Sequence, residues 1–321
     1  MRVAITGAGG FIGSNLVSFL QAEGHEVLAV SRTKHNENGV GYLSLNVCDE
    51  NSVEILACRF ENCQAVVHTV GLAHDNSNIA DGEKSQFEKV NVTSSINVAR
   101  AAAAAEVELL VYISSVKVHG QSSTALDGEV KRALTDWDTL QPEGIYGTSK
   151  KKAEEAIIRT LAASKTKYVI LRPPLVYGVG QKGNLKKLCE FFAKRRIMVW
   201  PKLKNQRSMI GVGNLCGAIA KIIASRNEES GAYLIADTNV STSELISRIG
   251  QASHTRLIFI PMPKQLILFL ASLIGKRDSA EKLFGSLVVD DSMFRRQFDW
   301  KPSESLEYVI EKMFKRGSDR A

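Results

Sequence analysis

The first thirteen residues constrain the fold of this chain more than any other stretch. A short apolar run over residues 3–5 is followed by glycines at spacings of three, and apolar residues then recur with a helical period from residue 11 to residue 20. This order predicts a strand, a tight turn and a helix, the arrangement that binds the pyrophosphate of a dinucleotide. The phosphates would lie on the unpaired N–H groups at the helix N-terminus. The residues that we assign to this cofactor turn are Gly7, Gly10, Phe11, Ile12 and Gly13.

Each of the three glycines is required in this turn for a different physical reason. Gly7 lets the chain turn sharply off the strand, and Gly10 has no side chain to hold a pyrophosphate away from the backbone. Gly13 lets the helix pack closely on the sheet. A glycine-rich loop without a ligand is the alternative, but the strand before the turn and the helix after it favour a cofactor site.

The following segments predict the rest of an α/β fold. Apolar runs over residues 26–30, 42–47 and 65–68, and a further one over 109–115 that ends in two serines, alternate with segments of helical pattern, among them an alanine-rich one at 87–105. Such alternation predicts a doubly wound, parallel Rossmann sheet, with ligands at the carboxyl ends of its strands. We expect residues 1–174 to form this NAD(P)-binding domain. A smaller C-terminal lobe would bind the substrate, built mainly from residues 175–321, with some segments returning to the Rossmann domain.

The end of the second strand bears on the choice between NAD and NADP. An acidic side chain usually accepts hydrogen bonds from the adenosine ribose of NAD there, whereas this chain has Ser31 followed by Arg32. A guanidinium suits a 2′-phosphate, and the missing carboxylate removes a repulsion against it. The sequence therefore favours NADP slightly over NAD. Alternatively, Arg32 stacks on the adenine or points to solvent.

A tyrosine and a lysine four residues apart, Tyr146 and Lys150, open a segment of helical pattern. Residues at this spacing share one face of a helix. The positive charge of the lysine is expected to lower the pKa of the phenol, so that Tyr146 acts as general acid and base. Ser115 adds a hydroxyl at the end of the fifth strand. A Tyr-x-x-x-Lys pattern alone is common by chance, but together with this serine and the glycine turn it is specific.

With these residues the chain resembles the extended short-chain dehydrogenases/reductases, the NAD-dependent epimerase/dehydratase group that acts on nucleotide sugars, over nearly its whole length. The resemblance implies an enzyme, usually a homodimer, that binds NAD or NADP and a nucleotide sugar. It implies a catalytic triad of Ser115, Tyr146 and Lys150. The further cofactor contacts that it implies are Asn46, Val47, Gly71, Asn91 and Pro173, and the further substrate contacts are Asn184, Leu185, Trp200 and Arg207.

Departures from the family pattern reduce the number of reactions that fit this chain. Val116 and Lys117 follow Ser115 where a 4,6-dehydratase has an Asp-Glu pair, which argues against dehydration. Leu175 stands where well-known UDP-galactose 4-epimerases have asparagine, and other motifs resemble a subgroup that includes UDP-N-acetylquinovosamine-type 4-ketoreductases. We therefore favour a UDP-4-keto-sugar 4-reductase. The alternative is a UDP-glucose or UDP-N-acetylglucosamine 4-epimerase with tightly bound NAD, and a more distant one is a non-catalytic NADP-binding sensor or scaffold.

Composition and charge limit the partners, metal sites and compartments that we expect for this chain. The 41 Lys and Arg against 34 Asp and Glu give a net charge of +7, which suits anionic small molecules or a solvated surface. No aromatic platform accompanies the charge, so we expect no nucleic-acid partner. The five cysteines lack metal-ligand spacing, and we expect no metal site. The N-terminus leads straight into a strand without a signal peptide, which favours the cytoplasm.

One long apolar stretch spans residues 257–274. Pro261 and Pro263 interrupt it, and the remaining run is shorter than the roughly 20 residues that span a membrane. We expect no stable membrane insertion and a buried helix after the proline turn. The alternative is a surface patch that touches a membrane or a partner.

Overall fold

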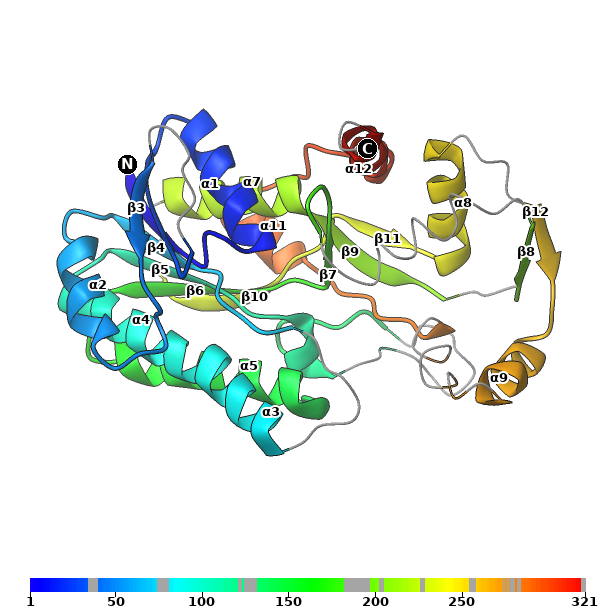
Figure 1. Ribbon diagram of the computed structural model, residues 1–321, viewed down its shortest axis with the longest axis horizontal. Coiled ribbons are helices and arrows are strands. Elements are labelled where there is room, and N and C mark those ends of the chain that lie inside the picture. Colours follow the sequence, from blue (N-terminus) through cyan, green and yellow to red (C-terminus); the bar gives the residue numbers. More distant parts are fainter. Residues whose placement is uncertain are drawn as a thin grey trace.

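The computed structural model of the chain describes residues 1–33, 40–73, 81–120, 123, 132–181, 197–201, 205–225, 229–253, 258–273, 275, 277, 281 and 284–318. They form an elongated molecule, with an α/β domain at one end and a smaller lobe at the other (Figure 1).

Seven parallel strands form the central sheet, in the order β10-β6-β5-β4-β1-β2-β3. The inner strands are apolar along nearly their whole length, as expected where helices cover both faces. The chain builds outward from β1 in both directions, and open α/β sheets bind ligands where the order reverses. The strands are β1 (Arg2–Thr6), β2 (Glu26–Ser31), β3 (Gly41–Ser44), β4 (Ala65–His68), β5 (Leu109–Ile113), β6 (Lys167–Arg172) and β10 (Gly231–Leu234).

Helices cover the two faces of this sheet and build two separate cores (Figure 1). On one face lie α1 (Phe11–Ala22), α7 (Val212–Ala224) and α11 (Ser292–Phe298), and on the other lie α2 (Ser52–Phe60), α4 (Ser94–Ala104) and α5 (Gly144–Leu161). Two further helical segments, α3 (Asp81–Phe87) and a π-helical segment (Glu88–Thr93), lead into α4. Helices α7 and α11 and strand β10 come from the second half of the chain, so part of that half packs in the α/β domain.

The smaller lobe has its own core around Tyr177, Met209, Ile246 and Val309. A three-stranded sheet, in the order β11-β9-β7, and a two-stranded sheet of β8 and β12 form its framework. Its elements are β7 (Leu175–Tyr177), β8 (Ile197–Trp200), β9 (Arg207–Gly211), β11 (Thr238–Val240), α8 (Thr242–Ala252), β12 (Ile258–Pro261), α9 (Lys264–Leu273) and α12 (Leu306–Ser318).

Three local expectations from the sequence are wrong. The strand expected over residues 42–47 ends at Ser44, because the Asn46 side chain bonds to nearby polar groups and forms a turn. The helix expected over 87–105 contains the π-helical segment around Asn91. The buried helix expected after Pro263 is α9, and it has no buried residue. Its apolar residues stand on all sides of the helix, so their pattern does not distinguish burial from exposure.

Candidate active site

The glycine turn has the geometry that a dinucleotide cradle requires. Gly7 has a positive φ of +82°, and a Cβ there would lie 2.9 Å from the backbone nitrogen of Val70. A Cβ on Gly13 would lie 2.2 Å from the carbonyl oxygen of Gly7, closer than atoms pack. Side chains are therefore excluded at both positions. Helix α1 packs as closely on the strand as a phosphate-binding turn requires.

The N-terminus of α1 lies directly after the glycine turn. Gly10 precedes the helix in an extended conformation and is exposed, and no side chain caps the helix end. The first N–H groups of an α-helix, here those of Phe11, Ile12 and Gly13, have no acceptor within the helix. They can bind a pyrophosphate, whose negative charge the helix dipole also favours. The turn therefore fits the cofactor predicted from the sequence.

At the other end of the predicted cofactor site, the groups after β2 and β3 form a polar cluster. The Ser31 hydroxyl is hydrogen-bonded to the Tyr42 hydroxyl at 2.6 Å. Arg32 is exposed, and its carbonyl oxygen accepts a hydrogen bond from Ser44 at 3.2 Å. Its guanidinium thus lies at the surface where a 2′-phosphate or solvent would meet it.

The predicted adenine residues lie in the turn that follows β3. The Asn46 amide donates to Asp49 at 2.8 Å, and its oxygen accepts from the backbone of Cys48 at 3.3 Å. Val47 is buried, and its carbonyl oxygen accepts from the amide of Asn97 at 3.0 Å. Asn97 thus ties this turn to α4, which fixes the position of the residues predicted to contact the adenine.

Ser115 and Tyr146 meet at the carboxyl edge of the sheet. Ser115 follows β5 and begins a 3-10 turn (Val116–His119), where its hydroxyl accepts from the Lys117 N–H at 3.2 Å. The Ser115 side chain is also hydrogen-bonded to the phenol of Tyr146, near the start of α5. Burial raises the pKa of Tyr146, and the hydrogen bond to Ser115 acts in the opposite direction.

Lys150 lies one turn further along α5 and is directed into the protein. Its ammonium donates to the carbonyl oxygen of Ile113 at 2.9 Å and to the hydroxyl of Tyr112 at 3.2 Å, and it lies 4.7 Å from the centre of the Tyr112 ring. Burial lowers the pKa of Lys150 to about 7, while the charge of Glu154 opposes that shift. The expectation that the lysine lowers the phenol pKa is corrected here: the pKa of Tyr146 is raised, because burial outweighs the other contributions.

The loop after β4 covers the lysine. A Cβ on Gly71 would lie 2.9 Å from the Lys150 ammonium nitrogen, so a side chain at this point would shift the lysine from its present position. Asn91 holds the next residue of the loop by both backbone groups, accepting from the Leu72 N–H at 2.7 Å and donating to its carbonyl oxygen at 3.2 Å. The same amide donates to Ser149 of α5 at 2.8 Å. The π-helical segment thus positions Asn91 so that its side chain joins this loop to α5.

A buried polar network beneath the triad was not predicted from the sequence. Glu154, on α5, accepts from the Ser114 hydroxyl at 2.5 Å and forms a buried ion pair with Arg172, whose Nη2 lies 2.7 Å from the carboxylate. The guanidinium also lies 3.2 Å from His119. The signal for this network was present: Glu154 follows Lys150 by four residues on the same helix face, and a carboxylate on a buried face needs a cation.

The remaining predicted contacts come from the second half of the chain. Pro173 is buried, and its carbonyl oxygen accepts from the Val116 N–H at 3.0 Å, which places it beside Ser115. The Trp200 indole donates to Ser243 at 3.0 Å and packs within the smaller lobe. Arg207 begins β9, and burial lowers the pKa of its guanidinium. The predicted contacts Asn184 and Leu185 lie outside the described residues.

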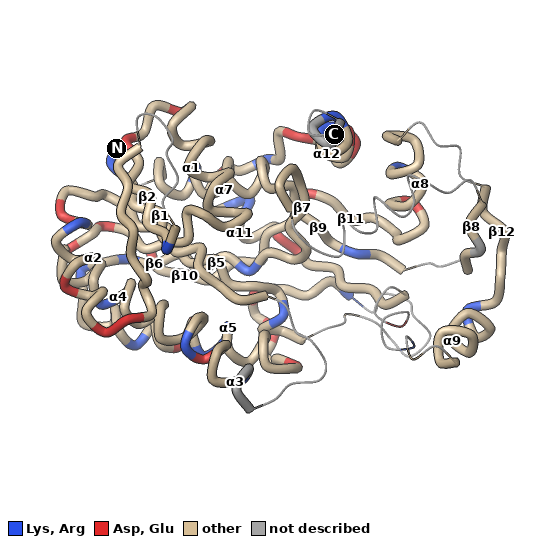
Figure 2. Tube along the Cα trace, viewed as in Figure 1, with Lys and Arg blue, Asp and Glu red and all other residues tan. Residues whose placement is uncertain are grey.

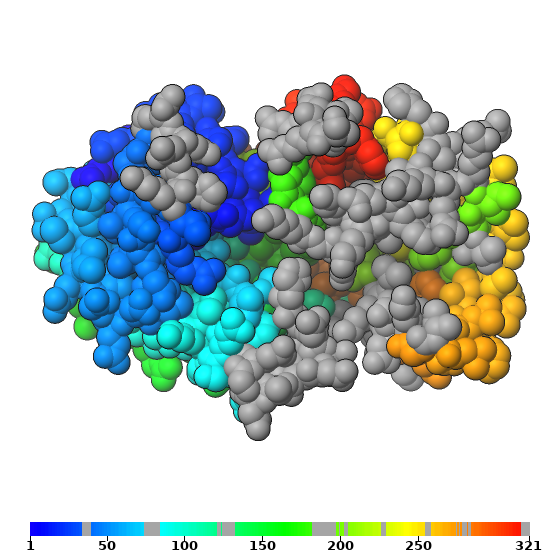
Figure 3. Space-filling model, viewed as in Figure 1, coloured from blue at the N-terminus to red at the C-terminus, as the bar shows by residue number. Residues whose placement is uncertain are grey.

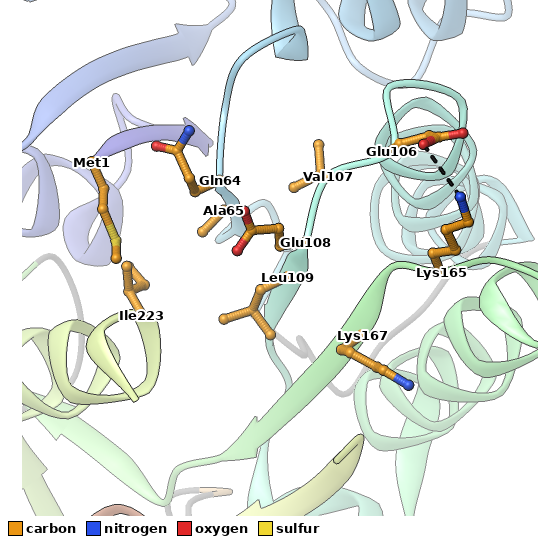
Figure 4. A pocket seen from close by; sticks show the side chains of 10 residues that line it. All are labelled: Met1, Gln64, Ala65, Glu106, Val107, Glu108, Leu109, Lys165, Lys167 and Ile223. Carbon is orange, nitrogen blue, oxygen red and sulfur yellow. Dashed lines mark ion pairs between the residues drawn. The ribbon is translucent and has the colours of Figure 1, made fainter. Parts of the chain in front are cut away.

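A hollow elsewhere on the domain has no connection with this site. Met1, Gln64, Leu109 and Lys167 line it, at the amino ends of four parallel strands (Figure 4). Ser115 follows the carboxyl end of β5, at the opposite edge of the sheet. The predicted site residues lie around the glycine turn, the loop after β4 and the N-terminus of α5.

Comparisons with known proteins agree with this architecture. A model of the NAD dependent epimerase/dehydratase family matches residues 3–236. The UDP-glucose 4-epimerase of Vibrio cholerae is 28% identical over 307 residues, which are 95% of this chain and 92% of that protein.

Solved structures with the same fold cover the chain from end to end. MoeE5 in complex with UDP-glucose and NAD has a TM-score of 0.78 at 20% identity, and the match covers 100% of this chain and 99% of that one. The UDP-glucose-4-epimerase of Stenotrophomonas maltophila, with bound NAD and formylated UDP-arabinopyranose, has a TM-score of 0.78 at 19% identity, with 100% and 99% covered. The Rossmann fold expected from the sequence is confirmed.

Proposed function

Because the chain belongs to the NAD-dependent epimerase/dehydratase family, we propose that it is an oxidoreductase acting at C4 of a UDP-sugar. The observation that carries the proposal is the hydrogen bond between Ser115 and Tyr146 at the carboxyl edge of the sheet, with Lys150 one helical turn away. When bound, NAD or NADP would accept hydride from the sugar carbon or donate it. Gly7, Gly10 and the first turn of α1 would hold its pyrophosphate.

In this proposal the chain's own residues transfer one proton and bind one oxygen atom of the sugar. Tyr146 removes the proton of the C4 hydroxyl, or returns it to the C4 oxygen in the reverse direction, and Ser115 hydrogen-bonds that oxygen. The raised pKa of the phenol suits the donor role, because Tyr146 then carries its proton at neutral pH. Lys150 supplies a positive charge one helical turn from Tyr146, from an ammonium held by Tyr112 and Ile113.

The smaller lobe is proposed to bind the nucleotide part of the substrate. Asn184, Leu185 and Trp200 are the family-matched positions for its phosphates and base. Arg207 would face the diphosphate, because a partly buried guanidinium pairs strongly with phosphate oxygens. Arg207→Lys is expected to weaken substrate binding without changing cofactor binding, since a lysine keeps the charge but not the fork of donors.

Two reactions share this half-reaction. A 4-epimerase is favoured by the UDP-glucose 4-epimerase of Vibrio cholerae, which is similar over 95% of this chain. A UDP-4-keto-sugar reductase using NADP is favoured by the exposed Arg32 at the end of β2. In either case Val116 and Lys117 follow Ser115, so the second acid and base of a 4,6-dehydratase are not at those positions. A homodimer in the cytoplasm is part of the same proposal, and a non-catalytic NADP sensor is the outcome if neither reaction occurs.

The first experiment identifies the nucleotide released when protein purified without added cofactor is denatured. Stoichiometric NAD supports a 4-epimerase, which must keep its cofactor oxidised and bound. Protein without nucleotide that oxidises NADPH with a UDP-4-keto-sugar supports the reductase. Tyr146→Phe should abolish turnover while UDP-sugar binding survives, and Tyr233→Phe, at a buried tyrosine on the far edge of the sheet, should leave turnover unchanged. Activity retained by Tyr146→Phe would refute the proposed acid/base.

The cofactor preference has its own test. Arg32→Ala should raise the dissociation constant of NADPH by about tenfold or more and that of NADH little, because a charge-assisted pair with the 2′-phosphate contributes about 1.5–3 kcal/mol. Arg100→Ala removes the same charge at an exposed helix position and serves as the control. Equal effects of Arg32→Ala on both cofactors would contradict the assignment of NADP.

A further inference from the structure

A line of polar side chains runs through the α/β domain to Lys150. It consists of Thr6, His68, Ser95, Tyr112 and Lys150, and we call it the buried polar chain. It joins strands β1, β4 and β5 to helices α4 and α5. Blue and cyan residues from the first part of the sequence form most of the surface of this end of the molecule in the view of Figure 3. The members of the chain lie inside, because none of them is more than 4% exposed.

The hydrogen bonds around His68 decide which ring nitrogen carries its hydrogen. The hydroxyls of Ser94 and Ser95 lie 3.3 and 3.1 Å from Nε2, and each has a single hydrogen. Both hydrogens are donated to carbonyl oxygens four residues earlier, in the π-helical segment, at 2.5 and 2.7 Å. Neither serine has a second hydrogen, so the neutral ring donates from Nε2. Its Nδ1 then accepts from the Thr6 hydroxyl, 2.7 Å away.

The direction of the Tyr112 hydroxyl follows from the same donors and acceptors. This hydroxyl is hydrogen-bonded to the side chain of Ser95, and it accepts from the Lys150 ammonium at 3.2 Å. An ammonium has no lone pair, so the phenol hydrogen is not donated to Lys150. Ser95 donates its own hydrogen to the π-helical segment, and its oxygen is therefore the acceptor for Tyr112. With its hydrogen held by Ser95, the Tyr112 oxygen presents a lone pair to Lys150.

Among the described residues, the titratable groups that face Lys150 come from three elements. Helix α5 contributes Tyr146 and Glu154, strand β5 contributes Tyr112, and strand β4 contributes His68, whose ring is stacked on that of Tyr112 at 5.5 Å. Of the six charged residues of α5 (Figure 2), only Lys150 and Glu154 are buried. Burial lowers the pKa of His68 to about 3, and the charge of Lys150 acts in the same direction. At neutral pH the buried polar chain therefore brings no second cation to Lys150.

We propose that Ser95, supported by His68, is a positioning residue for Lys150 and acts through the hydroxyl of Tyr112. A buried ammonium stays charged only where hydrogen-bond acceptors replace its water. In the described part of the chain its acceptors are Tyr112 and the carbonyl oxygen of Ile113. Without Ser95 the phenol hydrogen loses its acceptor, the hydroxyl rotates, and its bond with the ammonium weakens. The proposal rests on the proposed function, which gives the charge of Lys150 its role.

The test measures the ionisation of Lys150 in protein without substrate or cofactor. NMR titration of protein with isotope-labelled lysine follows the pKa of each lysine, and the resonance missing from Lys150→Met identifies Lys150. Ser95→Ala should lower the pKa of Lys150 from about 7 to about 6, because a hydrogen bond to a charged group is lost.

The matched control is Ser94→Ala, which should leave the titration of Lys150 unchanged. Ser94 lies on the same helix, is equally buried and donates to a carbonyl oxygen in the same way as Ser95. Within the described residues it is hydrogen-bonded to His68 and not to Tyr112. Circular dichroism verifies that both variants fold, which is expected because each loses one hydroxyl and His68 keeps the other serine as its partner.

A double variant shows whether Ser95 acts through Tyr112. Tyr112→Phe alone should lower the pKa of Lys150 by a similar amount, and Ser95→Ala added to it should change nothing further. Where turnover of a UDP-sugar is measurable, its pH profile should move toward acid in Ser95→Ala and stay in place in Ser94→Ala.

Three results would overturn the proposal. In the first, Ser95→Ala leaves the pKa of Lys150 at its wild-type value. In the second, Ser94→Ala lowers it as much as Ser95→Ala does, so that loosening of α4 is the cause. In the third, the effects of Ser95→Ala and Tyr112→Phe add in the double variant, so that the serine acts independently of the tyrosine. If the expected titration is found but no UDP-sugar is turned over, the positioning of Lys150 is supported and the proposed function is contradicted.

Discussion

The buried ammonium of Lys150 makes the stability of this protein depend on pH in a specific way. Burial holds its pKa at about 7 in the folded state, against 10.5 for an ordinary lysine. Between these values the unfolded chain binds one proton more than the folded chain, so the free energy of unfolding rises with pH. From pH 7 to pH 9 the gain is about 2 kcal/mol, at about 1.4 kcal/mol per pH unit once the folded lysine is neutral.

Lys150→Met removes this contribution and keeps an unbranched side chain in the same space. We expect the unfolding free energy of the wild type, measured relative to the variant, to rise by about 2 kcal/mol from pH 7 to pH 9. For a protein of this size that is a change of about 4 °C in the difference between their melting temperatures. Thermal unfolding of nucleotide-free protein, followed by circular dichroism at several pH values, measures it.

The control is Lys152→Met on the same helix, where the lysine is 48% exposed and forms an ion pair with Glu88. Exposed pairs of this kind contribute at most about 1 kcal/mol, so the variant should follow the pH dependence of the wild type. If Lys150→Met and the wild type change in parallel from pH 7 to pH 9, the lysine keeps an ordinary pKa and the reasoning fails.

Three further predictions concern the surroundings of the lysine and the cofactor turn. Tyr112→Phe removes one acceptor of the buried ammonium and should move the pH profile of turnover about one unit toward acid, because a hydrogen bond to a charged group contributes about 1.5 kcal/mol; an unmoved profile would contradict this. Glu154→Gln leaves the guanidinium of Arg172 buried without its carboxylate and should lower the unfolding free energy by about 3–5 kcal/mol, whereas Glu88→Gln at an exposed pair should cost under about 1 kcal/mol. Gly13→Ala should abolish binding of NAD(H) in calorimetric titration, since its Cβ would lie 2.2 Å from a backbone oxygen, and wild-type affinity would show that the turn adapts.

The sequence predicts those parts of the fold that local chemistry decides. The glycine turn is recognisable because a positive φ at Gly7 and a close backbone approach at Gly13 both require a residue without a side chain. The strands β1, β4 and β5 are recognisable as short apolar runs between helical segments. Tyr146 and Lys150 are recognisable as a pair because four residues make about one helical turn.

Other features depend on contacts between distant segments, which periodicity does not contain. Whether Lys150 turns toward the phenol or toward Tyr112 is decided by the strand beneath the helix and by Gly71 above it. The partner of Glu154 comes from a strand eighteen residues further along the chain. The burial of helix α9 could not be predicted either, because an apolar helix has the same sequence pattern whether the rest of the protein covers it or not.

One face of α5 carries three ionisable groups in order of increasing burial. This order connects the stability of the fold with the proposed proton transfer at Tyr146. Tyr146 is half-buried at the crevice, Lys150 is buried under the loop after β4, and Glu154 is buried deepest, in contact with Arg172. The charge of Glu154 raises the pKa of Lys150 against the effect of burial. Glu154→Gln should therefore do more than destabilise the protein: it should also lower the pKa of Lys150, so that turnover is lost at neutral pH and partly regained at lower pH. A variant that only unfolds more easily, with an unchanged pH profile, would show that the carboxylate supports the helix but not the lysine.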